Sequence, residues 1–334
     1  MRHFIIGDIH GCYDEMLKLL HKAGINNEDF IISVGDIVDR GPKSIQVYQF
    51  FKNRPNSKVI MGNHERKHLK GIYSYAQDIV RLQFGEQYDE FVKWIANLDY
   101  YYQTHHATVV HAALEPNLAM EQQKESVLAG TTAGDRYLQN LFPDSYWHQH
   151  YKATKPIIFG HHVTGDAPMI INNTIYGLDT GACHGGYLTG LLLPDFKIYQ
   201  VKVSKDYWLE EKIKWQLPVL KAKDWNNWTF DKIELEIQRF RRRNAQNKEI
   251  QAYLSQLAQA TSKTKNLVTL ILEHILTTIK TFPSNEFNQQ AQTYSSAPLF
   301  YMARANRLTK ERILEKYSSP NKLLALAQEL NLTT

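Results

Sequence analysis

Acidic, amide and imidazole side chains recur directly after short apolar runs in the first part of the chain. The first run, residues 4–6, is followed within four residues by Asp8 and His10. Later runs supply, in order, Asp36, Asn63, His111, His161 and Asp179. Because ligands collect at the carboxyl ends of strands in open α/β sheets, we expect these groups to meet at one edge of a sheet.

The types of these side chains predict a metal site. They offer carboxylate, imidazole and amide oxygen, and no thiolate, which suits Mn, Fe or Zn better than a sulfur-bound structural zinc. Six of these groups, all except Asp179, form the predicted ligand set, and six are too many for one catalytic ion that keeps open positions. They suit two divalent ions about 3.5–4 Å apart that share one carboxylate. The expected cofactor is therefore a pair of divalent ions, Mn first, with Fe or Zn as alternatives.

The apolar runs themselves predict the elements that position these groups. Strand-like runs at residues 30–34 and 58–61 alternate with helical patterns at residues 12–23 and 44–53. This alternation favours a layered α/β sheet. The later runs, residues 108–110, 157–159, 174–178, 187–193 and 197–203, are strand-like as well. Their close spacing predicts a second, more antiparallel sheet.

After residue 203 the pattern becomes helical. Amphipathic patterns cover residues 208–220 and 225–260, and residues 266–280 predict a mostly buried helix. A polar loop at residues 283–296 precedes two expected short helices, residues 308–317 and 320–330. We therefore expect two domains: residues 1–203 with the sheets, and residues 204–334 as a helical extension that caps the core or binds a partner.

Charge is divided unevenly between these two parts. Residues 204–334 carry 20 Lys and Arg against 13 Asp and Glu, whereas residues 1–203 carry 19 against 21. Of the 14 histidines, 13 precede residue 200, so the chemistry is expected in the first part. The basic cluster of Arg239 and residues 241–243 could bind nucleic acid or an acidic substrate, because phosphate contacts are what such clusters make. A solvated or acid-paired helix face is the alternative.

The compartment expected from the sequence is the cytoplasm. Only two cysteines are present, Cys12 and Cys183, and they form no disulfide framework. Each is expected to be a small buried apolar side chain. No run reaches the roughly 18 apolar residues of a membrane helix, and no signal-peptide pattern opens the chain.

The ordered motifs carry a resemblance to a known family. They are GDIHG (residues 7–11), GDIVDRG (35–41), GNHE (62–65), VVHAALEPNL (109–118), FGHH (159–162) and LDTGACHGG (178–186). Together they resemble the phosphoprotein phosphatase (PPP) branch of the calcineurin-like metallophosphoesterases over about residues 2–203. The resemblance implies an α/β fold: a metallophosphoesterase β-sandwich flanked by helices, here with an all-α C-terminal extension.

The resemblance also implies a role for each motif residue. Asp8 and His10 correspond to ligands of one metal, Asp36 to the bridging carboxylate, and Asn63, His111 and His161 to ligands of the other metal. Asn63 also corresponds to a phosphate contact. His161 is preferred to its neighbour His162, and Asp179 and His184 are expected to be structural.

Three further residues correspond to the catalytic groups of the family. Arg40 corresponds to the residue that grips phosphate, because a guanidinium can bind two phosphate oxygens at once. His64 corresponds to the general acid, and Asp39 to the carboxylate that orients it. The implied reaction is direct in-line attack by a metal-bridging hydroxide.

The substrate is less closely defined by the resemblance than the reaction is. The first expectation is a phosphomonoesterase similar to the Ser/Thr protein phosphatases, acting on a phosphorylated protein. A hydrolase of dinucleoside polyphosphates or RNA ends is the alternative, and a non-catalytic metal-containing binding module is another. Protein phosphatases of this branch have a second phosphate-binding arginine, for which the chain offers only Arg136, in GTTAGDRYL. A surface role for Arg136 is equally compatible with the sequence.

Overall fold

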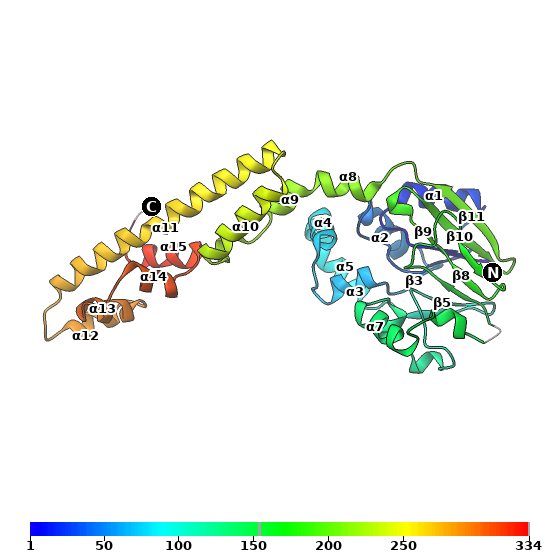
Figure 1. Ribbon diagram of the computed structural model, residues 1–334, viewed down its shortest axis with the longest axis horizontal. Coiled ribbons are helices and arrows are strands. Elements are labelled where there is room, and N and C mark those ends of the chain that lie inside the picture. The colour runs from blue at the N-terminus through cyan, green and yellow to red at the C-terminus, as the bar shows by residue number, and fades with distance from the viewer. Residues whose placement is uncertain (153–154, 333–334) are drawn as a thin grey trace. The chain divides into compact units, whose positions relative to one another are not determined.

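The computed structural model describes residues 1–152 and 155–332. It divides into two compact units, Met1–Val219 and Leu220–Thr334. The first unit holds both β-sheets, and the second is helical (Figure 1). The sequence places the division after residue 203, whereas the first compact unit extends further and includes helix α8, Tyr207–Lys214.

The first sheet has the strand order β11–β10–β1–β2–β3. The strands are β1 His3–Ile6, β2 Phe30–Ser33, β3 Ser57–Val59, β10 Tyr187–Leu193 and β11 Lys197–Lys202, and β9 Asp179–Thr180 pairs with β10. β1, β2 and β3 are parallel, whereas β10 is antiparallel to both β1 and β11. The carboxyl ends of three parallel strands therefore lie at one edge of this sheet.

The second sheet has the order β4–β5–β6–β8–β7. The strands are β4 Tyr101–Gln103, β5 Thr108–Val110, β6 Ile157–Phe159, β7 Met169–Ile171 and β8 Ile175–Gly177. Its three central strands, β5, β6 and β8, are parallel, and only the edge strands are antiparallel.

The predicted second sheet exists and contains the runs at residues 108–110, 157–159 and 174–178, but its central strands are parallel and the last two runs do not join it. β10 and β11 belong to the first sheet, where β10 pairs with β1 in the register Ile5 to Leu191. A run of apolar residues predicts a strand but not its partner, because pairing depends on where the chain crosses between the layers. The predicted α/β sandwich itself is confirmed.

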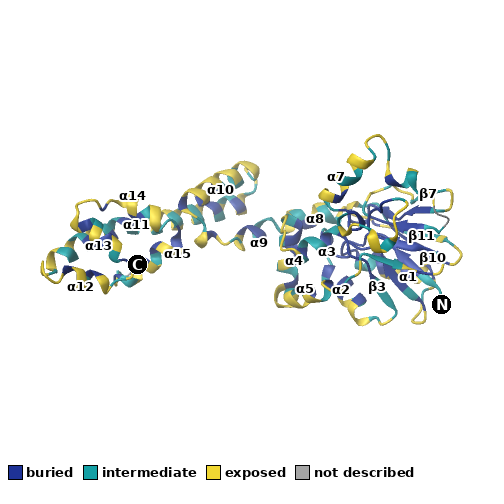
Figure 2. Ribbon diagram, turned by 90° about the horizontal axis from the view of Figure 1, so that it is seen from below, coloured by how far each residue is buried: buried dark blue, intermediate teal, exposed yellow. Residues whose placement is uncertain are grey.

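Alternation along the strands explains the layers. In β1, Ile5 clusters with Val109 and Ile158 of the other sheet, whereas its neighbours Phe4 and Ile6 cluster with residues of the flanking helices. β1 therefore has one face in the sandwich interior and one under helices, and both faces are apolar. Most residues of the central strands β1, β5, β6, β8 and β10 are buried, and the interior of the first unit is dark blue in Figure 2.

The helices of the first unit cover the outer faces of the two sheets and adjoin the loops of the site. They are α1 Tyr13–Lys22, α2 Ser44–Asn53, α3 Asn63–Leu69, α4 Tyr75–Phe84, α5 Tyr88–Ile95, α6 Glu125–Leu128 and α7 Thr132–Leu141, followed by α8. The boundary between the units falls within α9, Gln216–Lys221.

The second unit has its own apolar core, in which Ile271, Ile275 and Leu323 are fully buried. Its helices are α10 Phe230–Arg243, α11 Lys248–Thr281, α12 Phe287–Gln292, α13 Ala297–Arg304, α14 Lys310–Lys316 and α15 Pro320–Glu329. In the basic cluster on α10, Arg239 pairs with Glu236 at 3.2 Å.

Two predictions for this region need correction. α11 runs unbroken through residues 261–265, where the sequence places a gap between two helices. These residues are polar but include no Gly or Pro, so the helical hydrogen bonds continue through them, and their side chains are half-buried or exposed. The expected loop at residues 283–296 contains α12. Across the described residues, no helix is both long and apolar enough to span a bilayer.

Candidate metal centre

The loops after β1, β2, β3, β5 and β6 bring the predicted ligands together. Asp8, His10, Asp36 and His111 are each at least 95% buried, and Asn63 and His161 are half-buried. Two groups form. In one, the ligand atoms of His10, Asp36 and His64 lie within 4.8 Å of one another, and in the other those of Asp36, His111 and His161 do.

Asp36 belongs to both groups. Its Oδ2 lies 3.6 Å from Nε2 of His10, and its Oδ1 lies 3.5 Å from Nε2 of His111. The two oxygens of one carboxylate therefore face different imidazoles. This is the arrangement that a carboxylate shared by two cations requires.

Hydrogen bonds fix which nitrogen of each imidazole is available. His10 donates from Nδ1 to the carbonyl of Val38 at 2.8 Å, and His111 donates from Nδ1 to the carbonyl of Val34 at 3.0 Å. Each ring therefore presents the lone pair of its Nε2 to the centre. Backbone partners that set the tautomer in this way are typical of metal-binding histidines.

Acceptor atoms face one another in the second group. Oδ1 of Asn63 lies 3.1 Å from Nε2 of His111 and 3.1 Å from Nδ1 of His161. Because Nε2 of His111 carries no proton, it and the amide oxygen are two acceptors directed at the same space. A cation satisfies such a set of lone pairs, so the donor chemistry fits a divalent ion.

Burial keeps these imidazoles neutral. It lowers the pKa of His10 well below the usual range, assisted by Arg40 and His64, and it also lowers the pKa of His111. Burial and the neighbouring His111 lower the pKa of His161 to about 3. Neutral imidazole is the form that binds metal.

Three carboxyl groups are buried at the same place. Burial, with Asp179 and Asp36 nearby, raises the pKa of Asp8 well above its usual value. Burial likewise raises the pKa of Asp179 to about 6. The negative charge that these groups would carry calls for a compensating positive charge, which divalent ions would provide.

Close backbone approach holds two of the carboxylates in place. A Cβ on Gly160 would lie 2.0 Å from Oδ1 of Asp8, and a Cβ on Gly62 would lie 2.2 Å from Oδ1 of Asp36. No other residue fits at either position. The backbone N–H of His161 donates to both oxygens of Asp8, at 3.1 and 3.2 Å.

Five residues of the site have a left-handed backbone. The φ angles are 44° at His10, 50° at Asp36, 69° at Asp39, 66° at Arg40 and 67° at His161. Most of the other non-glycine residues with positive φ are asparagines, which tolerate this conformation. Strained backbone of this kind concentrates at functional sites.

Arg40 lies over the first group. Its Nη1 donates to Nε2 of His10 and its Nη2 donates to Nε2 of His64, each at 3.1 Å. The two terminal nitrogens of the guanidinium therefore span the two imidazoles.

His64 is held by a buried carboxylate. Its Nδ1 donates to Oδ2 of Asp39 at 2.5 Å. His68 donates from Nε2 to Oδ1 of Asp39 at 3.1 Å, and Gln77 donates to Oδ2. Burial opposes ionisation of Asp39, but His68 and His64 outweigh it, so the pKa of Asp39 lies below its ordinary value.

Sequence analysis missed His68, Gln77 and the role of Glu65. The spacing of His64 and His68, four residues apart on α3, was the available signal, because residues i and i+4 share a helix face. Glu65 accepts hydrogen bonds from the backbone N–H groups of Asp36 at 2.8 Å, Ile37 at 2.9 Å and Gly62 at 3.2 Å. It thereby holds the turn that presents Asp36.

The remaining predicted residues lie at or beyond the rim. Asp135, His161 and His162 form a third, more exposed group of ligand atoms within 4.8 Å, and His162 does not join Asp36. Arg136 is exposed on α7, and within the described residues no hydrogen bond or ion pair ties it to the centre. Cys12 and Cys183 are buried, as predicted.

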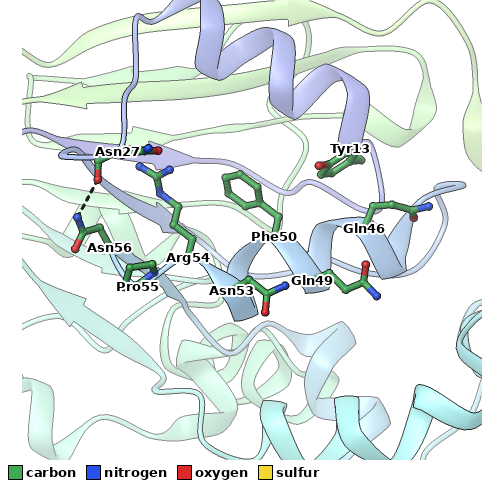
Figure 3. Close-up of a pocket in the computed structure, with 9 residues that line it drawn as sticks. All are labelled: Tyr13, Asn27, Gln46, Gln49, Phe50, Asn53, Arg54, Pro55 and Asn56. Atoms are coloured by element: carbon green, nitrogen blue, oxygen red, sulfur yellow. Dashed lines mark hydrogen bonds between the residues drawn. The ribbon is translucent and has the colours of Figure 1, made fainter.

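A hollow elsewhere in the first unit shares no residue with these groups. It lies between α1 and α2 and includes Tyr13, Gln46 and Phe50 in its lining (Figure 3). No predicted site residue lines it.

Comparison with known proteins agrees with this geometry. Residues 1–172 match the model of the calcineurin-like phosphoesterases. The chain belongs to this family. It is therefore a metal-dependent phosphoesterase, as the motifs predict, and calcineurin-like phosphoesterases use a binuclear metal centre.

Two relatives of this calcineurin-like phosphoesterase have the same name. The asymmetrical bis(5'-nucleosyl)-tetraphosphatase PrpE of Bacillus velezensis is 29% identical over 238 residues, covering 62% of this chain and 95% of the relative. The protein of the same name from Bacillus subtilis strain 168 is 29% identical over 238 residues, covering 62% and 97%. A crystal structure of a candidate diadenosine tetraphosphatase has a TM-score of 0.50 and 24% identity, covers 60% of this chain and 93% of the other, and supports the fold.

Proposed function

We propose that the protein hydrolyses dinucleoside polyphosphates at a centre of two divalent cations. The observation that carries the proposal is the pairing of the two ligand groups around Asp36 with relatives that are named bis(5'-nucleosyl)-tetraphosphatases. Those relatives align over nearly their whole length with 62% of this chain.

The proposed ligands divide between the two cations. Asp8 and His10 would hold one ion, and Asn63, His111 and His161 the other, with Asp36 shared. The opposed directions of the two Asp36 oxygens support this division. Bound divalent cations would polarise phosphoryl oxygens and activate water for in-line attack on phosphorus. Mn is the ion we would supply first, with Fe or Zn as alternatives.

Arg40 is proposed to orient the phosphate. Its two terminal nitrogens donate to His10 and His64 in the structure, so both N–H groups already point over the centre. Two oxygens of one phosphoryl group would replace the imidazole nitrogens as acceptors. This contact fixes the phosphorus in line with the attacking water and offsets developing negative charge.

His64 is proposed to protonate the leaving oxygen. Its Nδ1 is occupied by Asp39, so only Nε2 can carry a proton towards the substrate. Asp39 stabilises the imidazolium that this role requires, and it holds the ring in one orientation. The leaving group would be a nucleotide phosphate.

Substrate assays with the manganese-loaded full-length protein test this function. We expect kcat/KM for diadenosine tetraphosphate to exceed that for a phosphoserine peptide or a 3'-phosphorylated RNA by orders of magnitude. A preference of that size for the phosphopeptide would contradict the proposal and favour the phosphomonoesterase expected from the motifs. No turnover of any phosphoester would favour the binding-module alternative.

A further inference from the structure

We propose that a hollow beside the metal centre is a nucleobase subsite, formed by α7 and the segment that follows it. The class of ligand rests on the proposed function. The hollow has a volume of about 610 Å³, which lies within the usual range for small-molecule sites of roughly 300–1,000 Å³.

The hollow adjoins the candidate metal centre through two of its lining residues. Ala113, Asp135 and His162 are part of its lining. The ligand atoms of Asp135 and His162 lie within 4.8 Å of each other and of the candidate metal ligand His161, and the two histidine rings are 4.5 Å apart. The hollow is therefore close enough to the centre for the base of a nucleotide whose phosphates bind there.

Aromatic side chains form the outer wall. Trp147 is only 5% exposed and packs edge-on against Phe159 of β6 at 5.4 Å between ring centroids. Phe142 stacks on His150 at 4.2 Å. Both contacts fix the positions of these rings, so the wall is formed before any ligand arrives.

Tyr146 lies at the rim with its ring available. It is 70% exposed, an unusual state for an aromatic side chain, and its ring is nearly parallel to that of His148, with 4° between the planes. An exposed aromatic ring beside a hollow is a stacking platform for a base, because every base offers a π-face.

The charge of the lining favours a neutral base over a phosphate as the ligand of this hollow. Asp135 and Asp144 line the hollow, and no Lys or Arg is among the described residues that line it. Such a lining repels phosphate but accepts a neutral base, whose exocyclic amino group can donate to a carboxylate. Gln139 and Gln149 also line it, and among the described residues neither side-chain amide has a hydrogen-bond partner. Their donors and acceptors are free for the edge of a base.

Adenosine binding to the full-length protein tests the subsite without turnover. Saturation-transfer NMR should detect contacts to the base protons of adenosine, and Tyr146→Ala should weaken adenosine binding about tenfold, the lower end of the usual loss when a stacking ring is removed. Tyr146→Phe keeps the ring and should bind as the parent does. Leu141→Ala, an exposed position on α7 outside the lining, is the matched control.

Kinetics with the same variants complete the test. Tyr146→Ala should raise KM for diadenosine tetraphosphate about tenfold and leave kcat unchanged. Unchanged adenosine binding and KM in this variant would overturn the subsite, even if the parent hydrolyses diadenosine tetraphosphate. Loss of adenosine binding in Tyr146→Ala, in a parent that does not cleave diadenosine tetraphosphate, would support the subsite and reject the proposed function instead.

Discussion

Nε2 of His68 lies 3.1 Å from Oδ1 of Asp39, on the oxygen opposite to the one that accepts from His64. Two imidazoles of the same helix therefore share one buried carboxylate. Nδ1 of His68 in turn lies 2.9 Å from the hydroxyl of Tyr88, which donates to it. The catalytic role proposed for His64 depends on this whole chain of contacts.

We expect His68→Phe to lower kcat about tenfold with little change in KM. The phenyl ring fills the space beside Phe91 and Tyr88, but Asp39 loses a donor and holds His64 less firmly. Because a 4-nitrophenolate leaving group needs no proton, the loss should be smaller with 4-nitrophenyl phosphate. An equal loss of kcat with 4-nitrophenyl phosphate and with diadenosine tetraphosphate would show that His68 has only a structural role. His21→Phe, on an exposed face of α1, is the control.

Asp36→Asn should reduce the metal content and lower kcat about a thousandfold, because the shared carboxylate can no longer bridge two cations. Metal per chain, measured by mass spectrometry after dialysis, should fall below that of the parent. Glu211→Gln, which changes a buried carboxylate on α8 outside both ligand groups, is the control. A parent-like rate and metal content in Asp36→Asn would contradict the two-metal proposal.

Glu65→Gln should weaken metal binding at least tenfold, in line with other residues that support metal ligands. The carboxylate accepts backbone N–H groups on both oxygens, so an amide NH₂ at one of them would face donors. Metal titration and thermal unfolding would measure both effects. Glu15→Gln tests a buried carboxylate that accepts from Tyr207 instead, and it should cost stability without changing metal affinity.

Stability should depend on pH through Asp29. Arg2 contacts both oxygens of this buried carboxylate, at 2.9 and 2.6 Å, and its hydrogen bond lowers the pKa of Asp29. The folded state then binds the Asp29 proton less readily than the unfolded state does. The stabilisation is full above the unfolded pKa of about 3.9 and is lost as the pH falls through the folded value.

Arg2→Gln should therefore lower Tm by a few degrees at pH 7, and the difference from the parent should shrink towards pH 3. The exposed pair of Lys43 and Asp14 provides the comparison, since Lys43→Gln should change Tm little at either pH. A difference for Arg2→Gln that stays constant across this range would contradict the assignment.

A fragment ending at residue 219 should be more stable than one ending at residue 203. Within the first unit, Tyr75 donates to the carbonyl of Lys212 at 2.7 Å, Tyr207 donates to Glu15 at 3.0 Å, and Gln83 donates to Glu211 at 3.2 Å. The shorter fragment leaves these groups without their partners and uncovers apolar surface. Thermal unfolding would compare the two fragments, and equal Tm values would contradict this boundary.

The candidate site could be predicted in large part because its residues follow strands directly. A candidate ligand such as Asp8 or His111 lies within two residues of a buried run, so the strand fixes its place. His68 and Glu65 were harder to recognise because they act on other site residues, and a helix position alone does not reveal what it contacts. Only the folded loops bring Asp39 and the turn at Asp36 within their reach.

The pairing of strands could not be predicted in the same way. The alternation that identifies β10 as a strand is the same whichever sheet it joins. Its place beside β1 follows from the path of the chain after β9, over which the sequence has no periodic signal. In the second unit, the polar residues 261–265 continue helix α11, so their polarity did not indicate the end of a helix.

The left-handed backbone at His10, Asp36, Asp39, Arg40 and His161 has a consequence for engineering. Each such residue costs the folded state about 1–3 kcal/mol relative to a relaxed conformation, and glycine would relieve that cost. Selection for thermal stability alone would accept glycine at these five positions. The variants would then lose the side chains proposed to bind metal and phosphate. Mutant libraries intended to raise the thermal stability of this enzyme should keep these five residues unchanged and vary the surfaces of the helices instead.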